Sequence, residues 1–339
     1  MFYVGSMSDV KQIDLKKTIL AIAGPTASGK SALAMDIAQK YESVIINADS
    51  MQIYSDLSVL TARPDVDDMA QIPHALYGVM DGSKRCNVRH WLELARQAVE
   101  HARSQQRLPI LVGGTGLYLN AARHGISDIP EVSEQLHQKA VTLYQQIGGR
   151  AFKEKLMQFD CDTATRLAEG DSQRLIRAMG VYWQTEQPLS YWHSQPLTGE
   201  LKGEFIQIAH LPPRQSVYDS INQRVIKMLE QNAIKEVQNL LSRNLDPALP
   251  VMKALGVAHI SAFLKEEIGF DALISSISQD TRHYAKRQFT WFNNNFISYK
   301  MIKNNITFQV PLDEANTDYQ TIMEYIENGG EVIDNGGNE

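Results

Sequence analysis

A glycine-rich segment that ends in a lysine and a serine carries the clearest signature of chemistry in this sequence. It matches the phosphate-binding pattern G-x-x-x-x-G-K-[ST] at every fixed position, and its residues are Gly24, Pro25, Thr26, Ala27, Ser28, Gly29, Lys30 and Ser31. Glycines let backbone N–H groups turn toward an anion at the positive end of a helix. Lys30 adds a positive charge, and the Ser31 hydroxyl is suited to a magnesium ion. The segment predicts a bound di- or triphosphate, without indicating whether phosphate is transferred, hydrolysed or expelled.

Two further segments offer polar groups beside such an anion. Asp49 follows the apolar run 44–47, and Thr115 lies in the sequence GGTG after the apolar run 108–112. Because open α/β sheets bind ligands at the carboxyl edge of their strands, we expect both residues to face the phosphate-binding segment. Asp49 could accept a proton from a nucleophile or hold magnesium indirectly, and Thr115 offers a hydroxyl. Taken alone, Asp49 also fits a helix cap or turn aspartate, and GGTG also fits an ordinary tight turn.

The elements that must position these residues alternate between strand and helix patterns. Short apolar runs predict buried strands at 18–24, 44–47 and 108–112, and amphipathic patterns predict helices at 31–40 and 90–106. This alternation is typical of α/β proteins with a doubly wound parallel sheet.

From about residue 126 the pattern becomes helical. Apolar residues at helical spacing predict helices at 134–147 and 172–183, and later at 216–231, 233–242 and 272–292. The alternating segment 205–210 predicts a strand that could return the chain to the sheet. We therefore predict a phosphate-loop α/β core whose first part spans 18–125, an inserted all-helical domain at 126–202, a return to the core with C-terminal helices at 203–300, and an extension at 301–339 whose tail is disordered from about 327.

Composition limits the classes of protein that are possible. The 339 residues are 43% hydrophobic and 21% charged, which supports a sizeable core and excludes wholesale disorder. Two cysteines, Cys86 and Cys161, cannot build a disulfide scaffold or a four-thiolate zinc site. No apolar run approaches ~18 residues, and the N-terminus lacks a secretory or organelle-targeting pattern, so we expect a cytoplasmic chain with no membrane partner. The net charge of −6 disfavours nonspecific nucleic-acid binding.

Several of these motifs together resemble those of a known enzyme family. GPTASGKS, NADSMQIYSDL followed by TARP, LPILVGGTGLYL, QRLIRAMGVY and TRHYAKRQFTWF occur in the order and approximate spacing of tRNA dimethylallyltransferases, across about residues 18–296. The resemblance implies transfer of a dimethylallyl group from its diphosphate to N6 of the adenine at position 37, beside the tRNA anticodon, with release of diphosphate and a requirement for Mg²⁺. In this interpretation the phosphate loop holds the leaving group, Asp49 is the general base and Thr115 orients its neighbours.

The resemblance also implies a set of residues that contact tRNA. They are Asp49, Ser50, Met51, Gln52, Thr115, His137, Gln173, Arg174, Leu175, Ile176, Arg177, Lys253, Gly256, Lys286, Arg287 and Gln288. Gln52 could bind the edge of the adenine once that base has left its stack. A helical wheel independently places Arg174 and Arg177 off the apolar face, where they could meet phosphates or simply be solvated.

Some positions depart from the family pattern. Residues 255–259 read LGVAH, where many members read something like I-G-Y-[KR]-[EQ], and His137 stands where relatives often carry an arginine. We therefore expect retained chemistry with an altered grip on tRNA. Arg224 falls at the rim of an apolar helix face, which indicates an anionic partner, either diphosphate or a structural carboxylate.

Two other functions remain open. A phosphate-loop kinase of a nucleotide or small metabolite would share this segment and would close the arginines of 166–177 over ATP. A non-catalytic, GTPase-like RNA-binding switch is disfavoured because no N-K-x-D segment occurs. The partners predicted by the favoured interpretation are the tRNA anticodon loop and dimethylallyl diphosphate. The sequence does not determine the oligomeric state, and we expect a monomer.

Overall fold

The computed structural model describes residues 15, 17–295, 299–303, 306–310 and 332–333. The chain divides into two compact units. The first, which we call the core unit, combines Met1–Arg123 with Leu201–Glu339, and the second, the helical unit, is His124–Glu200. The helical unit therefore interrupts the core unit in sequence.

A twisted sheet forms the centre of the core unit. Its parallel part has the order β3 (His74–Ala75), β2 (Ser43–Asn47), β4 (Leu108–Gly113), β1 (Thr18–Ala23) and β5 (Glu204–Ala209). Every residue of β1, β2 and β4 is buried, which explains why these segments are continuous apolar runs. The predicted parallel α/β arrangement is confirmed, including the return of the chain to the sheet at β5.

Beyond β5 the sheet continues with antiparallel strands. These are β7 (Ile306–Val310), β6 (Tyr299–Lys303) and β8 (Val332–Ile333). The sequence did not predict them. The tail that was predicted to be disordered from about residue 327 lies outside the described residues, except for β8.

Helices cover the sheet and extend beyond its edge. Ala34, Ile37 and Ala38 of α1 (Lys30–Ala38) pack in one cluster with Leu20 and Ile22 of β1. The buried stripe of α3 (Val88–Ser104) packs on β2 and β4. The remaining helices of the core unit are α2 (Val66–Gln71), α4 (Gly116–His124), α9 (Arg214–Glu230), α10 (Ala233–Ser242), η1 (Pro250–Lys253), α11 (Val257–Leu264) and α12 (Phe270–Asn295).

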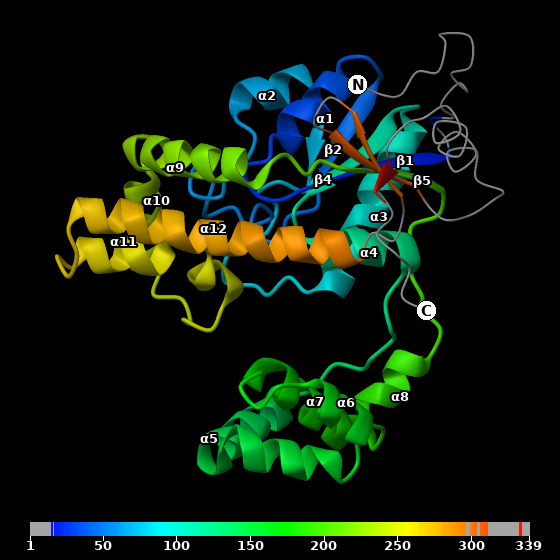
Figure 1. Ribbon diagram of the computed structural model, residues 1–339, viewed down its shortest axis with the longest axis vertical. Coiled ribbons are helices and arrows are strands. Elements are labelled where there is room, and N and C mark those ends of the chain that lie inside the picture. Colours follow the sequence, from blue (N-terminus) through cyan, green and yellow to red (C-terminus); the bar gives the residue numbers. More distant parts are fainter. Residues whose placement is uncertain (1–14, 16, 296–298, 304–305, 311–331, 334–339) are drawn as a thin grey trace. The chain divides into compact units, whose positions relative to one another are not determined.

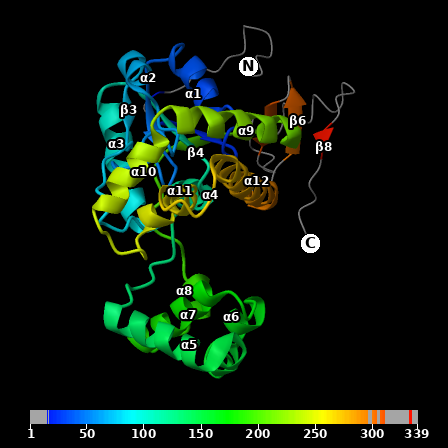
Figure 2. The same ribbon diagram turned by 90° about the vertical axis from the view of Figure 1, so that its left-hand side faces the viewer.

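Two long C-terminal helices lie side by side. Figure 1 and Figure 2 both show α12 next to α9, and the two helices contact one another. Arg282 of α12 donates to Asn222 Oδ1 of α9 at 2.7 Å. The predicted strands and helices of this region are confirmed, and α9 and α12 bring their side chains to the carboxyl edge of the sheet.

The helical unit has its own core. It consists of α5 (Glu134–Met157), α6 (Cys161–Arg166), α7 (Ser172–Thr185) and α8 (Leu189–Ser194), drawn in green in Figure 1. Its core contains Phe152, Leu156 and Leu175. Asp160 caps two of the helices, because its Oδ1 accepts from the N–H of Thr163 and its Oδ2 from the N–H of Ser190.

The chain enters and leaves the helical unit through paired backbone segments. Leu201 N–H donates to Ala122 O at 2.8 Å on the core side. Ile126 and Thr198 exchange two backbone hydrogen bonds of 2.9 and 3.0 Å within the helical unit. Among the described residues, no helix combines the length and apolar character that a bilayer crossing requires.

Candidate functional site

The phosphate-binding segment forms the turn between β1 and α1. Its backbone curls, because Ser28 N–H donates to Pro25 O at 3.3 Å and Gly29 adopts a φ of 90° that side chains disfavour. At Gly24 a Cβ would collide with the carbonyl oxygen of His210, which follows β5. Both fixed glycines of the motif are therefore required by geometry, and α1 begins directly after the turn, at Lys30.

Lys30 is a cation in a confined position. Its Nζ donates to Pro25 O at 3.2 Å, and burial lowers the pKa of its ammonium group to about 8. The Asp49 carboxylate opposes that shift, whereas the positive Arg224 adds to it. An anion bound in the turn would relieve this unfavourable arrangement of positive charges.

Arg224 reaches the same turn from α9. Its Nη2 donates to Thr26 Oγ1 at 2.6 Å, while its buried Nε has no partner among the described residues. Burial lowers the pKa of this guanidinium, and Asp49 raises it. The helical wheel finds the inward position of Arg224, but only the fold shows that it ends at the phosphate-binding turn.

Asp49 lies in a turn built by its own neighbours after β2. The side chain of Asn47 accepts from Asp49 N–H at 2.8 Å and donates to Asp49 O at 3.0 Å. Oδ1 of Asp49 then accepts from Met51 N–H at 2.9 Å, as in an Asx turn. Asp49 is thus a turn residue and, at the same time, a charge that acts on Lys30 and Arg224.

The GGTG segment approaches its neighbours too closely for side chains. A Cβ at Gly113 would collide with the backbone of Ala48, and at Gly116 with the ring of Trp291. Thr115 Oγ1 accepts from Ser50 N–H at 3.0 Å, which ties this turn to the Asp49 turn. The structure thus brings Asp49, Thr115 and the phosphate-binding turn together at the carboxyl edge of β1, β2 and β4.

Gln52 has part of its amide committed to the protein. Its Nε2 donates to Thr61 O at 2.9 Å and to Ala62 O at 2.8 Å. Ser50 and Met51 are half-buried in the same turn. The Oε1 of Gln52 could therefore accept a hydrogen bond from a nucleobase. The NH₂ group of Gln52 already donates to the loop that follows β2.

A carboxylate from α10 holds that loop from the other side. Glu236 accepts backbone N–H groups of Ser58, Val59 and Leu60 with its two oxygens. No motif in the sequence singles out Glu236. In the sequence, Glu236 is an isolated acidic residue on a predicted helix. Such residues are too common for this feature to identify a functional role.

The C-terminal candidates differ in exposure. Lys253, Lys286 and Arg287 are exposed, as expected for residues that meet RNA. Gly256 is buried with a φ of 95°. Gln288 is only 5% exposed, and both ends of its amide bond to the protein. Its side chain therefore lies in the interior of the protein, although the family resemblance implies that Gln288 contacts tRNA.

The candidates of the helical unit also separate into two groups. His137, Gln173, Arg174 and Arg177 are exposed, whereas Leu175 and Ile176 are buried in the core of that unit. Arg174 pairs with Asp171 at 3.2 Å. The side chains of Leu175 and Ile176 support the helix, so any contact with RNA falls to the exposed residues beside them.

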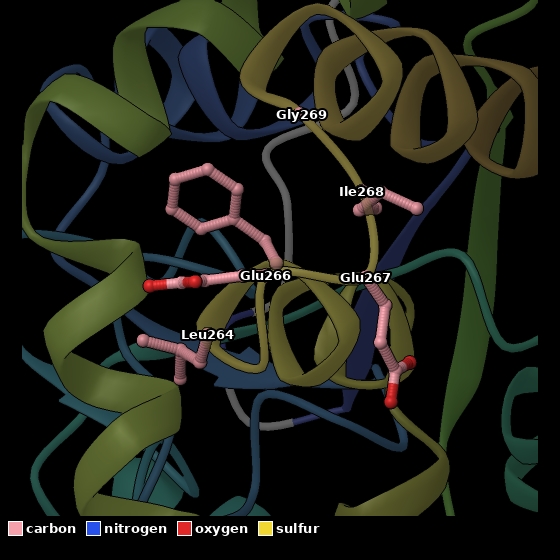
Figure 3. Close-up of a pocket in the computed structure, with 6 residues that line it drawn as sticks. Leu264, Glu266, Glu267, Ile268 and Gly269 are labelled. Carbon is pink, nitrogen blue, oxygen red and sulfur yellow. The ribbon is translucent and has the colours of Figure 1, made fainter.

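A surface hollow lies at the turn between α11 and α12, outside these candidates (Figure 3). Its lining is apolar and acidic, and consists of Phe263, Leu264, Glu266, Glu267, Ile268 and Gly269. Within the described ranges no group of three or more His, Cys, Asp or Glu side chains could hold a metal ion. The hollow has none of the charge that a diphosphate requires.

Comparisons with known proteins converge on one family. The family model described as IPP transferase matches residues 52–295, and the one described as isopentenyl transferase matches residues 17–77. A tRNA dimethylallyltransferase of Rhodospirillum rubrum is 43% identical over 86% of this chain and 90% of its own length. One from Hyphomonas neptunium is 44% identical over 82% of this chain and 88% of its own.

Solved structures show the same likeness. A eukaryotic dimethylallyltransferase captured acting on tRNA is 26% identical, with a TM-score of 0.70, over 81% of this chain and 70% of its own. A tRNA isopentenylpyrophosphate transferase from Bacillus halodurans is 28% identical, with a TM-score of 0.58, over 92% of this chain and 96% of its own.

Proposed function

The chain belongs to the tRNA dimethylallyltransferase family, the IPP transferases, and from that premise we propose its reaction in detail. It is an enzyme that transfers a prenyl group to tRNA. The donor is dimethylallyl diphosphate, and the acceptor is N6 of the adenine at position 37 in the anticodon loop. The C–O bond between the allylic carbon and the diphosphate breaks, an N–C bond forms, and the N6 proton leaves.

The phosphate-binding turn holds the leaving group. Lys30 and Arg224 are two cations aimed at this turn, and the N-terminus of α1 adds backbone N–H groups. They neutralise the charge that grows on diphosphate as the C–O bond lengthens, which is electrostatic stabilisation prepared before the reaction. The pairing of Lys30, with its lowered pKa, and the buried Arg224 at one turn is the observation that carries the proposal.

Magnesium fits this site through oxygen ligands. Ser31 is an exposed hydroxyl in the first turn of α1, and Mg²⁺ prefers one or two protein oxygens together with substrate phosphates and water. The ion would supply further charge neutralisation on the leaving diphosphate. The chain's own residues supply the orientation.

Asp49 accepts the proton from N6. One oxygen of its carboxylate caps the turn, which leaves Oδ2 for the acceptor amine. The N6 lone pair is delocalised into the adenine ring, so removal of the proton as the bond forms lowers the barrier. Thr115 keeps the Asp49 turn in place through Ser50, and Gln52 offers its carbonyl oxygen to the adenine edge.

The similarity to dimethylallyltransferases disfavours the kinase alternative. A kinase would also use the phosphate-binding turn, but it would transfer phosphate to a hydroxyl or phosphate acceptor. The similar proteins with known activity are instead dimethylallyltransferases. A labelled-donor assay separates the two.

The test mixes the full chain and tRNA with either labelled dimethylallyl diphosphate or ATP labelled at its terminal phosphate. We expect label from the prenyl donor in tRNA, with diphosphate released, and none transferred from ATP. Digestion of the product tRNA should give N6-(dimethylallyl)adenosine. Transfer of label from ATP to a small acceptor, with none from the prenyl donor, would overturn the proposal.

A further inference from the structure

Helix α12 packs closely against the GGTG turn. A Cβ at Gly114 would collide with the amide of Gln288, and one at Gly116 would collide with the Trp291 ring. Between them, Tyr284 lies near Thr115, whose hydroxyl partly offsets the rise that burial causes in the pKa of Tyr284. Residues 284, 288 and 291 share one face of a helix, so a single face of α12 is fitted to three consecutive residues of the turn.

Gln288 does more than fill space on this face. Its Oε1 accepts from the backbone N–H of Thr26 at 2.8 Å, and its Nε2 donates to the carbonyl of Gly114 at 2.8 Å. The amide therefore joins the phosphate-binding turn to the GGTG turn. The side chain is 5% exposed, and both ends are paired, as buried polar groups require.

We infer that Gln288 is a positioning residue that fixes the distance between the diphosphate cradle and the Asp49–Thr115 side of the site. This inference rests on the proposed function and deepens it. Thr26 also receives a hydrogen bond from Arg224, so Gln288 and Arg224 together determine where the first half of the turn lies. Thr115 supports the Asp49 turn through Ser50, so the other end of the Gln288 amide acts on the side that carries the base.

An RNA contact by Gln288 is the alternative that the sequence motif favours. Its neighbours Lys286 and Arg287 are exposed, and either could meet phosphates. Gln288 lies on the opposite, buried side of the helix, where the amide has no unpaired end. The two roles predict different losses: a positioning residue affects diphosphate binding and turnover, whereas an RNA contact affects tRNA affinity.

The first test compares Gln288→Met with the wild type and with Thr290→Ala. Methionine keeps the length of the side chain but cannot bridge the two turns. Thr290 is exposed on the same helix and its hydroxyl donates to Lys286 O, so it is a matched control. Three quantities are measured: kcat with both substrates saturating, the affinity for inorganic diphosphate with Mg²⁺ by calorimetry, and the affinity for tRNA.

We expect Gln288→Met to lower kcat by about 10-fold to 100-fold, as small displacements of reacting groups do. Its diphosphate affinity should also fall, whereas its tRNA affinity and the Thr290→Ala enzyme stay at the wild-type level. Lost tRNA affinity with normal kcat would overturn the inference and make Gln288 an RNA contact. A lowered Tm with normal kcat and normal diphosphate affinity would overturn it too, because the role would then be structural.

A second variant gives a readout that packing alone would not change. In Gln288→Glu the protonated acid can still donate to Gly114 O, whereas the ionised form repels that carbonyl. The ratio of variant to wild-type kcat should therefore rise as pH falls. The neighbouring ionisable side chains, Lys30, Arg224 and Tyr284, are the same in both proteins, so the ratio cancels their contribution. A ratio that stays constant with pH would contradict the donor role.

Failure of the proposed function is distinguishable from failure of this inference. A wild-type enzyme that forms no prenylated tRNA would overturn the function. The diphosphate titration does not depend on that reaction, and equal affinities of wild type and Gln288→Met would overturn the inference.

Discussion

At the scale of single residues, three charged side chains carry the proposed chemistry. Lys30 and Arg224 carry positive charge beside the phosphate-binding turn, and Asp49 acts electrostatically on both. The phosphate-binding motif predicts the role of Lys30. The position of Asp49 directly after a buried strand predicts that Asp49 lies at the same site. Arg224 follows the strand β5, and its role depends on how α9 packs, so spacing alone left two partners open for it.

The lowered pKa of Lys30 leads to a pH prediction. Diphosphate binding favours the protonated amine, so affinity should hold below pH 8 and fall as pH rises through about 8. Lys30→Arg should remove this decline, because a guanidinium stays charged over the whole window. Calorimetric titration with inorganic diphosphate and Mg²⁺ at several pH values checks it. An equal pH dependence in both proteins would argue against Lys30 as the titrating group.

The same lowered pKa of Lys30 makes the stability of the folded protein rise with pH, whereas the affinity for diphosphate falls. The folded pKa of about 8 lies below the ordinary lysine value of 10.5, so the unfolded chain binds more protons between these values. The contribution of Lys30 to the free energy of unfolding therefore rises as pH rises across that window in the absence of ligand. Diphosphate should reduce this rise, because it favours the protonated amine in the folded state.

Removal of the base should affect turnover more than binding. Asp49→Asn keeps the oxygen that accepts from Met51 N–H but cannot take a proton, so kcat should fall by about 10²-fold to 10⁴-fold. Affinity for tRNA should change little, since the base acts in the transition state. Asp65→Asn, at the exposed N-cap of α2, is a matched loss of a turn carboxylate. Normal turnover by Asp49→Asn would remove Asp49 from this role.

At the scale of elements, the loop after β2 is held by helices distant in sequence. Glu236 of α10 accepts three consecutive N–H groups of this loop, and the next two carbonyls hold the amide of Gln52. The position of Gln52 therefore depends on α10, although the two are far apart along the chain.

Loss of the Glu236 carboxylate should loosen this loop. Glu236→Ala leaves three partly buried N–H groups without a partner, and should lower the free energy of unfolding by about 1–3 kcal/mol. The KM for tRNA should rise, because Gln52 loses its anchored loop. Glu230→Ala, an exposed acid at the end of α9, is the control. Urea unfolding and steady-state kinetics measure both effects; a stability loss with unchanged KM would limit Glu236 to folding.

Predictability differs between elements for physical reasons. The buried strands β1, β2 and β4 are apolar on both faces, so hydrophobicity alone predicts them. Helices α5, α7, α9 and α12 bury one stripe each and were also predicted. By contrast, α4 begins inside GGTG, where glycines normally indicate a turn, and β6 and β7 depend on pairing with the edge of β5. Helices α5 and α7 of the helical unit and the parallel sheet of the core unit could be predicted from the sequence. The contacts that α12 makes with the two turns could not.

At the scale of the whole molecule, the chain divides its work between a unit with the proposed chemistry and a helical unit with exposed basic residues. Arg174 and Arg177 project from α7, where the wheel places them. The departure at His137 lies in the same unit, on the exposed side of α5. The sequence pattern predicted which residues of this unit are buried and which are exposed. An amphipathic helix buries its apolar face and leaves its polar face in solvent.

Phosphate contacts by these arginines would be seen in the salt dependence of binding. Arg174→Ala combined with Arg177→Ala should weaken tRNA affinity and reduce the slope of log K against log salt by about 1–2. Arg150→Ala removes an exposed arginine of the same unit that pairs with Glu154, and should leave the slope unchanged. Filter binding over a salt series measures the slope; equal slopes for the double variant and wild type would exclude these phosphate contacts.

The backbone hydrogen bond between Leu201 and Ala122 suggests that the helical unit can be removed from the core unit by protein engineering. Since the backbone leaves the core and rejoins it at adjacent points, a short flexible linker from Arg123 to Leu201 could close the gap with little entropic cost. Such a miniaturised protein would keep every described residue of the diphosphate site. It would therefore show whether the core unit binds diphosphate without the helical unit.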